Sequence, residues 1–342
     1  MQKKLIALAV AGLASTAAFA QSNVQIYGIV DMAGAIVDGE NGRNRYVLDS
    51  GVLSTSRIGF KGVEDLGNGL KALFTLEYGL TLDQNTGFAP GAATSGTSAR
   101  QQFVGLTGGF GTAVAGRLQT TGLDFTVASS ALGSSGPLGA TNVVGGATLI
   151  SAGSRADNAI AYISPSFAGL TVAINHARAP LAAEKAANTV GGENSATLAS
   201  VSYENGPITA GAVYSTFDGG AGAGRDLNEW GIRGGYDFGV AKLQAAYQEQ
   251  RTDQLVGSDD KNRKFVLSAS APVTAKIGVI GEYAKLYTKD GVNDNNRYAW
   301  TLAGTYSLSK RTTAYAGVVA DRRETAAGLD DTTYAVGLRH SF

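Results

Sequence analysis

Histidine and cysteine, two side chains that enzymes often use as catalytic base or nucleophile, are scarce in this chain of 342 residues, which has two histidines and no cysteine. Histidine is the most frequent general base in enzymes, and neither of the two histidines, His176 and His340, lies in a nucleophile motif. The sequence lacks a Gly-x-Ser-x-Gly elbow, and it has no cysteine that could attack a substrate or bind a metal. We therefore expect both histidines to be structural and the protein not to be an enzyme.

Two further groups of residues match ligand-binding motifs only in part. The glycines of Gly220–Gly224 lack the strand, helix and lysine that a phosphate-binding loop requires, so we interpret them as an ordinary loop. Carboxylates bind divalent cations, and six aspartates fall in segments that we interpret as loops: Asp253, Asp259, Asp260, Asp290, Asp294 and Asp330. Loop solubility explains them equally well, and no resident metal or cofactor is predicted.

The first twenty residues have the features of a secretory signal peptide. Lys3 and Lys4 supply the positive start, Leu5 to Leu13 the apolar stretch, and Ala18-Phe19-Ala20 the cleavage pattern, so the mature chain is expected to begin near Gln21. The 28 basic and 28 acidic residues of the whole chain then become a net charge of about −2, with which binding to nucleic acid is not expected. An exported chain without cysteine has no disulfide framework.

The hydrophobic period of the mature chain is that of β-strands. From Leu70 to Leu82 the even positions are apolar, while most odd positions are polar, and the segments 230–238 and 297–308 repeat this pattern. Such strands have one apolar and one polar face. After the signal peptide, no run approaches the roughly 18 apolar residues that a membrane helix requires. If the chain spans a membrane, we expect it to do so with strands.

Seven tight turns divide this pattern into hairpins. They lie at residues 65–69, 108–111, 164–167, 204–207, 237–239, 271–273 and 308–311, and two strands with one longer polar loop separate neighbouring turns. A soluble sandwich also alternates, but strict separation of short turns from long loops is typical of bacterial outer-membrane barrels. The prediction is an all-β fold, a transmembrane antiparallel β-barrel of about 16 strands with short periplasmic turns and long outer loops, enclosing an aqueous channel.

The longest gap in the strand pattern, about residues 118–157, exceeds ordinary loop length and is rich in Gly, Ser, Thr and Ala. We interpret it as a plug or constriction of a barrel that spans residues 21–342 as one domain. Aromatic side chains are expected where the apolar band of such a barrel meets water. The candidates for these girdles are Tyr78, Tyr298, Trp300, Tyr306, Tyr334 and Phe342.

Four segments carry a resemblance to a known family: Val24–Asp31, Ser54–Gly67, Leu308–Thr312 and Gly337–Phe342. Together they resemble the trimeric general porins of β-proteobacteria, the group that includes the Neisseria, Bordetella and Comamonas porins. The resemblance extends along the whole mature chain. It implies a homotrimer in the Gram-negative outer membrane, through which ions and small hydrophilic solutes diffuse passively.

The resemblance also implies where the pore narrows. In these porins the third outer loop folds into the barrel lumen, and the matching segment is 118–157, with Asp124 as its acidic residue. A ladder of arginines faces this loop, and the matching positions are Arg57, Arg100 and Arg155, with Glu77 as the wall carboxylate among them. Further candidates for positive charge in the lumen are Lys61 and Arg117.

Fixed positive charge in a narrow, low-dielectric passage concentrates anions, so we expect a mild anion preference. Gln101 and Gln102 stand where some relatives have a second arginine, which predicts a weaker field. The parity of Arg100, which it shares with Val104 and Leu106, does not show which way it points. It also remains open that the three arginines are ordinary charges balanced by nearby acids: Glu64, Glu77 or Asp157.

Two alternatives to a simple pore remain open at this stage. An outer-membrane hydrolase built on Ser, His and Asp groups would need a positioned base. A receptor or adhesin that acts through its outer loops follows no motif and could coexist with a pore. The expected surroundings are outer-membrane lipid and lipopolysaccharide, whose bridging divalent ions the loop aspartates could bind.

Overall fold

The computed structural model describes residues 23–40, 44–84, 99–133, 136–144, 154–178, 194–219, 226–253, 259–289, 296–324 and 330–342. The expected signal peptide, residues 1–20, lies outside the described residues and stays a prediction. Gly220–Gly224, Asp290 and Asp294 also lie outside them.

Seventeen β-strands in the described part of the chain form one antiparallel sheet. They are β1 (Asn23–Gly39), β2 (Arg45–Ser50), β3 (Arg57–Gly67), β4 (Leu70–Gly79), β5 (Ala99–Gly108), β6 (Gly111–Gln119), β7 (Arg155–Ile163), β8 (Leu170–Arg178), β9 (Ser195–Asn205), β10 (Ile208–Asp218), β11 (Leu227–Asp237), β12 (Lys242–Thr252), β13 (Asp260–Pro272), β14 (Ile277–Lys289), β15 (Arg297–Ser307), β16 (Thr312–Arg323) and β17 (Asp331–Ser341).

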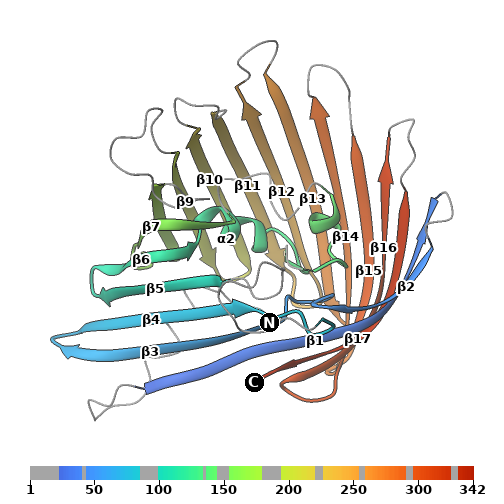
Figure 1. Cartoon of the computed structure of the whole chain (residues 1–342), viewed down its shortest axis with the longest axis horizontal. Helices are drawn as coiled ribbons and strands as arrows, with labels where there is room; N and C mark the ends of the chain where they lie inside the picture. The colour runs from blue at the N-terminus through green and yellow to red at the C-terminus, as the bar shows by residue number, and fades with distance from the viewer. Residues whose placement is uncertain are drawn as a thin grey trace.

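The sheet closes on itself, because β1 pairs with β17 and β9 pairs with β10. Figure 1 shows the strands in chain order along the wall. β2 and β3 pair with successive parts of β1 and together form one broken strand of the barrel. The prediction of a closed antiparallel barrel of sixteen strands is therefore confirmed. Closure pairs the backbone groups between strands, which hydrocarbon surroundings require.

Each of the seven predicted turns joins two strands of a hairpin. The turn between β3 and β4 shows why glycine is needed there. Gly67 and Gly69 have φ angles of 88° and 78°, in the left-handed region, and Asn68 between them has a φ of 52°. Asp65 supports the turn, because its Oδ1 accepts a hydrogen bond from the Gly67 N–H at 2.8 Å. The turn chemistry was therefore readable from the sequence.

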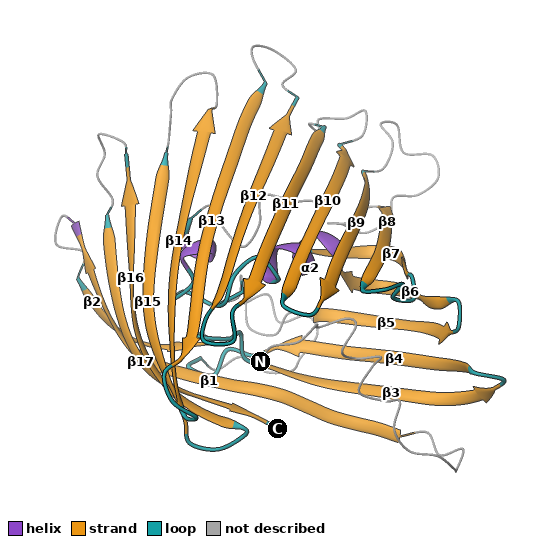
Figure 2. Ribbon diagram, turned by 180° about the vertical axis from the view of Figure 1, so that it is seen from behind, coloured by secondary structure: helices purple, strands orange, loops and turns teal. Residues whose placement is uncertain are grey.

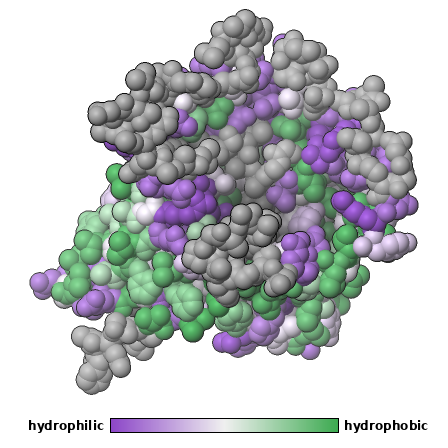
Figure 3. Space-filling model, in the orientation of Figure 1, coloured by the Kyte–Doolittle hydropathy of each residue, from purple (hydrophilic) through white to green (hydrophobic). Residues whose placement is uncertain are grey.

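The barrel has its apolar side chains on the outside and many buried polar side chains on the inside. On the outer face, Leu302 is 58% exposed and Val336 is 68% exposed, whereas the inward-facing Glu229, Gln248 and Lys264 are fully buried. In Figure 3, hydrophobic residues gather over the lower left, where β3, β4 and β5 lie in Figure 1. This distribution fits lipid around the barrel and water within it.

No helix within the described ranges is long and apolar enough to span a membrane.

Between β6 and β7 the chain turns into the barrel interior. Thr121–Val127 form the helix α2, which contacts β8, β9 and β10, and Ala140–Val143 form the short helix α3, which contacts β14, β15 and β16. Figure 2 shows α2 within the curved wall of strands. Phe125 of α2 packs in a cluster with three wall residues: Ala196, Leu198 and Val213. The loop therefore folds into the lumen, as predicted, and contacts two separate parts of the wall.

Candidate functional site

A charged cluster lies on the inner wall formed by β1, β3, β4 and β5. Glu77 of β4 accepts a hydrogen bond from Arg100 Nε, 2.7 Å from its Oε1, and one from the Tyr27 hydroxyl, 3.1 Å from its Oε2. Arg57, at the start of β3, is 8% exposed, and its charge acts on both Arg100 and Glu77. The structure therefore brings two of the predicted arginines to one predicted carboxylate.

An irregularity in β5 determines which way Arg100 points. The pairing of β4 with β5 passes from Gln101 directly to Ala99, so Arg100 is an extra residue in the ladder. A bulge of this kind interrupts the alternation of inward and outward side chains. Val104 is 62% exposed on the outer face, whereas Arg100 is 7% exposed beside Glu77. Sequence parity left this orientation open because parity assumes an uninterrupted strand.

Arg155, at the start of β7, belongs to the same electrostatic group. Its charge acts on Arg100, Arg57 and Glu77. Its Nε is buried and has no hydrogen-bond partner among the described residues. The three arginines of the predicted ladder therefore lie within electrostatic reach of one another. Only one of them forms a salt bridge with Glu77 in the described part of the chain.

Asp124 lies in α2, where the loop has left the wall. Its Oδ1 accepts a hydrogen bond from Gln119 Nε2 at 2.7 Å, and the charges of Arg155 and Arg233 act on it. Burial raises the pKa of Asp124 to about 7, against the opposing effects of the Gln119 hydrogen bond and the two guanidinium groups. The loop carboxylate therefore gains most of its negative charge near neutral pH.

Two further arginines contribute charge to the inner wall, although the prediction did not include them. Arg233 of β11 acts on Asp124, and Arg339 of β17 acts on Arg57. Each has a buried Nε that makes no hydrogen bond within the described ranges. The available signal was strand alternation, which places Arg233 on the polar face of its strand. Alternation alone does not show that distant strands meet around one lumen.

The two weaker candidates differ in their surroundings. Lys61 of β3 lies with its Nζ 5.3 Å from the centroid of the ring of Tyr27, the residue whose hydroxyl donates to Glu77. Arg117 of β6 is instead paired, because its Nη1 lies 2.5 Å from Asp157 Oδ1. The structure therefore leaves Arg117 beside the cluster and offsets its charge with a carboxylate.

Charged side chains also hold the far part of the loop. Glu282 of β14 accepts hydrogen bonds from the Thr141 N–H, at 2.7 Å, and from the Ser130 hydroxyl. Lys264 of β13 is fully buried and donates to the Thr141 carbonyl. Glu282 and Lys264 therefore hold the loop in place, and the Thr141 backbone and the Ser130 hydroxyl supply their hydrogen-bond partners.

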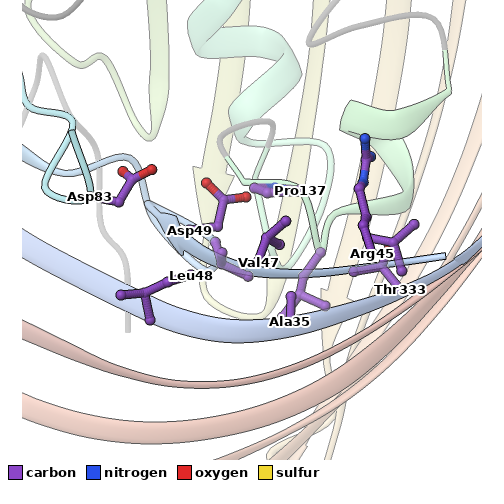
Figure 4. Close-up of a pocket in the computed structure, with 11 residues that line it drawn as sticks. Ala35, Arg45, Val47, Leu48, Asp49, Asp83, Pro137 and Thr333 are labelled. Atoms are coloured by element: carbon purple, nitrogen blue, oxygen red, sulfur yellow. The ribbon is translucent and has the colours of Figure 1, made fainter. Parts of the chain in front are cut away.

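A cavity of about 310 Å³ separates the loop from β1 and β2. Figure 4 shows Asp49 and Asp83 on one side of it and Arg45 on the other, with Pro137 of the loop near Val47 of the wall. The loop therefore does not fill the space between itself and this part of the barrel.

The histidines bond to hydroxyl groups. His176 Nδ1 lies 2.9 Å from Thr197 Oγ1, and His340 Nδ1 lies 2.9 Å from Thr312 Oγ1. Each pair joins two neighbouring strands of the barrel. Both contacts are of the kind expected for structural histidines.

Several of the loop aspartates lie next to arginines. Asp253 and Asp259 both contact Arg251, and Asp330 Oδ2 lies 3.6 Å from Arg322 Nε. No group of three or more His, Cys, Asp and Glu side chains that could hold a metal ion occurs in the ranges that the structure describes.

The six girdle candidates lie towards the strand ends with outward parity. Near the long loops lie Tyr78, Tyr298, Trp300 and Tyr334, and at the end with the short turns lie Tyr306 and Phe342. This is the spacing expected of two aromatic belts, and their role at a membrane interface stays a prediction.

Comparisons with known proteins agree with this geometry. A family model described as Gram-negative porin matches residues 7–326. Outer membrane porin protein 32 of Delftia acidovorans is 35% identical over 365 residues, with 100% of both chains covered. An outer membrane porin protein of Bordetella pertussis is 28% identical over 398 residues, again with 100% of both covered.

Solved structures show the same fold. The anion-selective porin from Comamonas acidovorans aligns with a TM-score of 0.79 and 30% identity, over 94% of this chain and 100% of its own. The trimer form of Vibrio cholerae OmpT aligns with a TM-score of 0.68 and 13% identity, over 94% and 99%, which shows the fold alone. With its closed barrel, polar interior and inserted loop, the chain belongs to the family of Gram-negative porins, the outer-membrane proteins through which solutes diffuse passively.

Proposed function

We propose that this porin passes small hydrophilic solutes and ions with a mild preference for anions, and that its filter lies between the loop that carries Asp124 and the wall arginines. One observation carries the proposal. Arg57, Arg100 and Arg155 interact electrostatically with one another and with a single carboxylate, Glu77, which forms a salt bridge with Arg100. The local excess of charge is therefore positive.

The physical chemistry of the guanidinium group suits such a filter. Arginine stays charged at any relevant pH and is weakly hydrated, so it attracts anions without trapping them. Low-dielectric walls focus this field into the water of the lumen. The preference is expected to be mild, because Glu77 and Asp124 carry opposite charge and because glutamines follow Arg100. The Comamonas relative is an anion-selective porin, which supports the same sign for this chain.

The proposal is tested by the reversal potential of the purified protein in a planar bilayer under a salt gradient. The wild-type channel should reverse at a potential of the anion-selective sign, and Arg57→Ser combined with Arg100→Ser should move this potential towards zero. Lys310→Ser, in the exposed turn between β15 and β16, is the control that removes a lysine outside the filter. A double variant with the reversal potential of the wild type would overturn the assignment of the filter.

We also propose that the protein is a homotrimer. Part of the apolar outer surface of each barrel would contact the neighbouring subunits, and the rest would contact outer-membrane lipid or lipopolysaccharide. The trimer form named for Vibrio cholerae OmpT supports this assembly for the fold. Cross-linking of the detergent-solubilised native protein should produce a species with three times the mass of the chain. A product that stops at one chain would contradict the trimer, while the bilayer experiment would still decide the pore.

A further inference from the structure

The second strand of the barrel is interrupted at a defined place. β2 and β3 pair with β1 on either side of a six-residue excursion, residues 51–56, which leaves the ladder. Opposite it, only two residues of β1, Val30 and Asp31, lie between the part that pairs with β3 and the part that pairs with β2. The excursion therefore frees backbone groups that a continuous ladder would have paired.

One buried carboxylate holds the excursion. Asp31 Oδ2 accepts hydrogen bonds from the Ser54 N–H at 2.7 Å and from the Leu53 N–H at 3.1 Å, and its Oδ1 accepts one from the Tyr315 hydroxyl at 2.5 Å. The Ser56 hydroxyl also bonds to the backbone of Asp31. Asp31 is fully buried, so it does not meet the permeating ions. It connects the excursion with β16.

The loop that enters the lumen also rests against this excursion, and we call the contact at Val52 its seat. The Val52 carbonyl accepts a hydrogen bond from the Leu138 N–H at 3.4 Å, and Val52 belongs to the same buried hydrophobic cluster as Leu138, Ala140 and Val144. A Cβ atom placed on Gly136 would lie 2.3 Å from the Val52 carbonyl oxygen. Glycine is therefore required at position 136 for the loop to approach this closely.

The same excursion ends at Arg57, the first residue of β3 and a member of the proposed filter. Both sides of the narrow passage, the loop near Leu138 and the wall at Arg57, are thus positioned by one segment. We infer that Asp31 and Tyr315 are positioning residues that determine the width of the pore. The inference rests on the proposed filter for the role of Arg57, but its readout is conductance rather than selectivity.

There is room for the loop to move if its seat is lost. Val52 and Leu138 line the cavity of about 310 Å³ that separates the loop from β1 and β2. A loop end released from Val52 can shift into this space, towards the wall and away from the centre of the lumen. Loss of the Asp31 contacts should therefore widen the passage.

Single-channel recording of the full-length protein tests this inference. Tyr315→Phe keeps the ring that packs over Gly337 and removes the hydroxyl, while Asp31→Asn keeps the size of the side chain and removes its charge. We expect the unitary conductance of each to rise by about 1.5-fold with more open-channel noise. Tyr334→Phe makes the same chemical change at an exposed position of β17 and should conduct like the wild type.

Gly136→Ala displaces the loop from the opposite side of the contact and changes no residue of the barrel wall. Because the added methyl group pushes the loop away from Val52 and into the lumen, this variant should instead lower the conductance, and it decides the question if an Asp31 variant fails to assemble. Wild-type conductance and noise in both Tyr315→Phe and Gly136→Ala would overturn the inference. A changed conductance with an unchanged sign of the reversal potential would support it independently of the proposed anion preference.

Discussion

Two regions of the inner wall use similar charged residues in different ways. On β3, β5 and β7, the arginines of the proposed filter outnumber the carboxylate beside them, and Arg155 Nε has no partner among the described residues. On β13 and β14, Lys264 and Glu282 are both bonded to Thr141 of the loop. Positive charge on β3, β5 and β7 is left in excess, whereas the charged groups on β13 and β14 hold the loop.

The difference has a physical cause. A buried ion needs partners, because leaving it unpaired costs far more than leaving it in water. The loop backbone offers those partners at Lys264 and Glu282. At the arginine wall, the carboxylate that accepts a guanidinium hydrogen bond is Glu77 of the wall itself, and it bonds to Arg100. The position of the loop therefore decides which charges are structural and which are available for permeation.

The largest effect is expected from removing the anchoring charges together. Lys264→Met with Glu282→Gln removes charge-assisted hydrogen bonds, each worth about 2 kcal/mol, and leaves the net charge unchanged. The loop should detach, and the unitary conductance should rise by about threefold, with little change in reversal potential. Lys261→Met, on the same strand and partly exposed, is the control. Lost selectivity with normal conductance would show that the two regions are not functionally distinct.

A smaller effect is expected from the carboxylate of the arginine wall. Glu77→Gln removes the negative charge between Arg57 and Arg100, so the anion-to-cation permeability ratio should rise by about twofold. Glu64→Gln, at the exposed end of β3, should leave the ratio unchanged. Reversal potentials in a salt gradient measure both. A lower ratio in Glu77→Gln would mean that Glu77 mainly positions Arg100.

The smallest effect is expected from pH. The pKa of Asp124 is about 7, so this carboxyl loses its proton as the pH rises from about 6 to 8, while the arginines stay charged. The added negative charge should lower the anion preference by less than about twofold over this range. Asp124→Asn should show no such dependence. The same slope in wild type and variant would assign the titration to another group.

Much of the fold could be predicted because each strand residue faces either lipid or the lumen. That contrast produces the alternation from Leu70 onwards, and the glycine turns, such as the one at Gly67 and Gly69, divide it into strands. The bulge at Arg100 and the break at residues 51–56 could not be predicted in this way. Both interrupt the period on which the prediction depends.

The site was predictable only as a set of residues. Resemblance identified Arg57, Glu77 and Arg100, and the structure places them together, but it did not include Arg233 or Arg339. Nor did it show that Arg117 is paired with Asp157. Whether a charged side chain is paired depends on its neighbours on other strands and in the loop, and strand alternation does not identify those neighbours.

By itself, the sequence determined a barrel with an apolar outside, the number of its strands and the positions of its short turns, because these follow from local period and turn chemistry. The tertiary structure decided where the lumen narrows. The contacts responsible join residues far apart in the chain: Tyr315 bonds to Asp31 across 284 positions, and Thr141 bonds to Glu282 across 141. Such pairs form only when the barrel closes around its loop, and no local pattern records them.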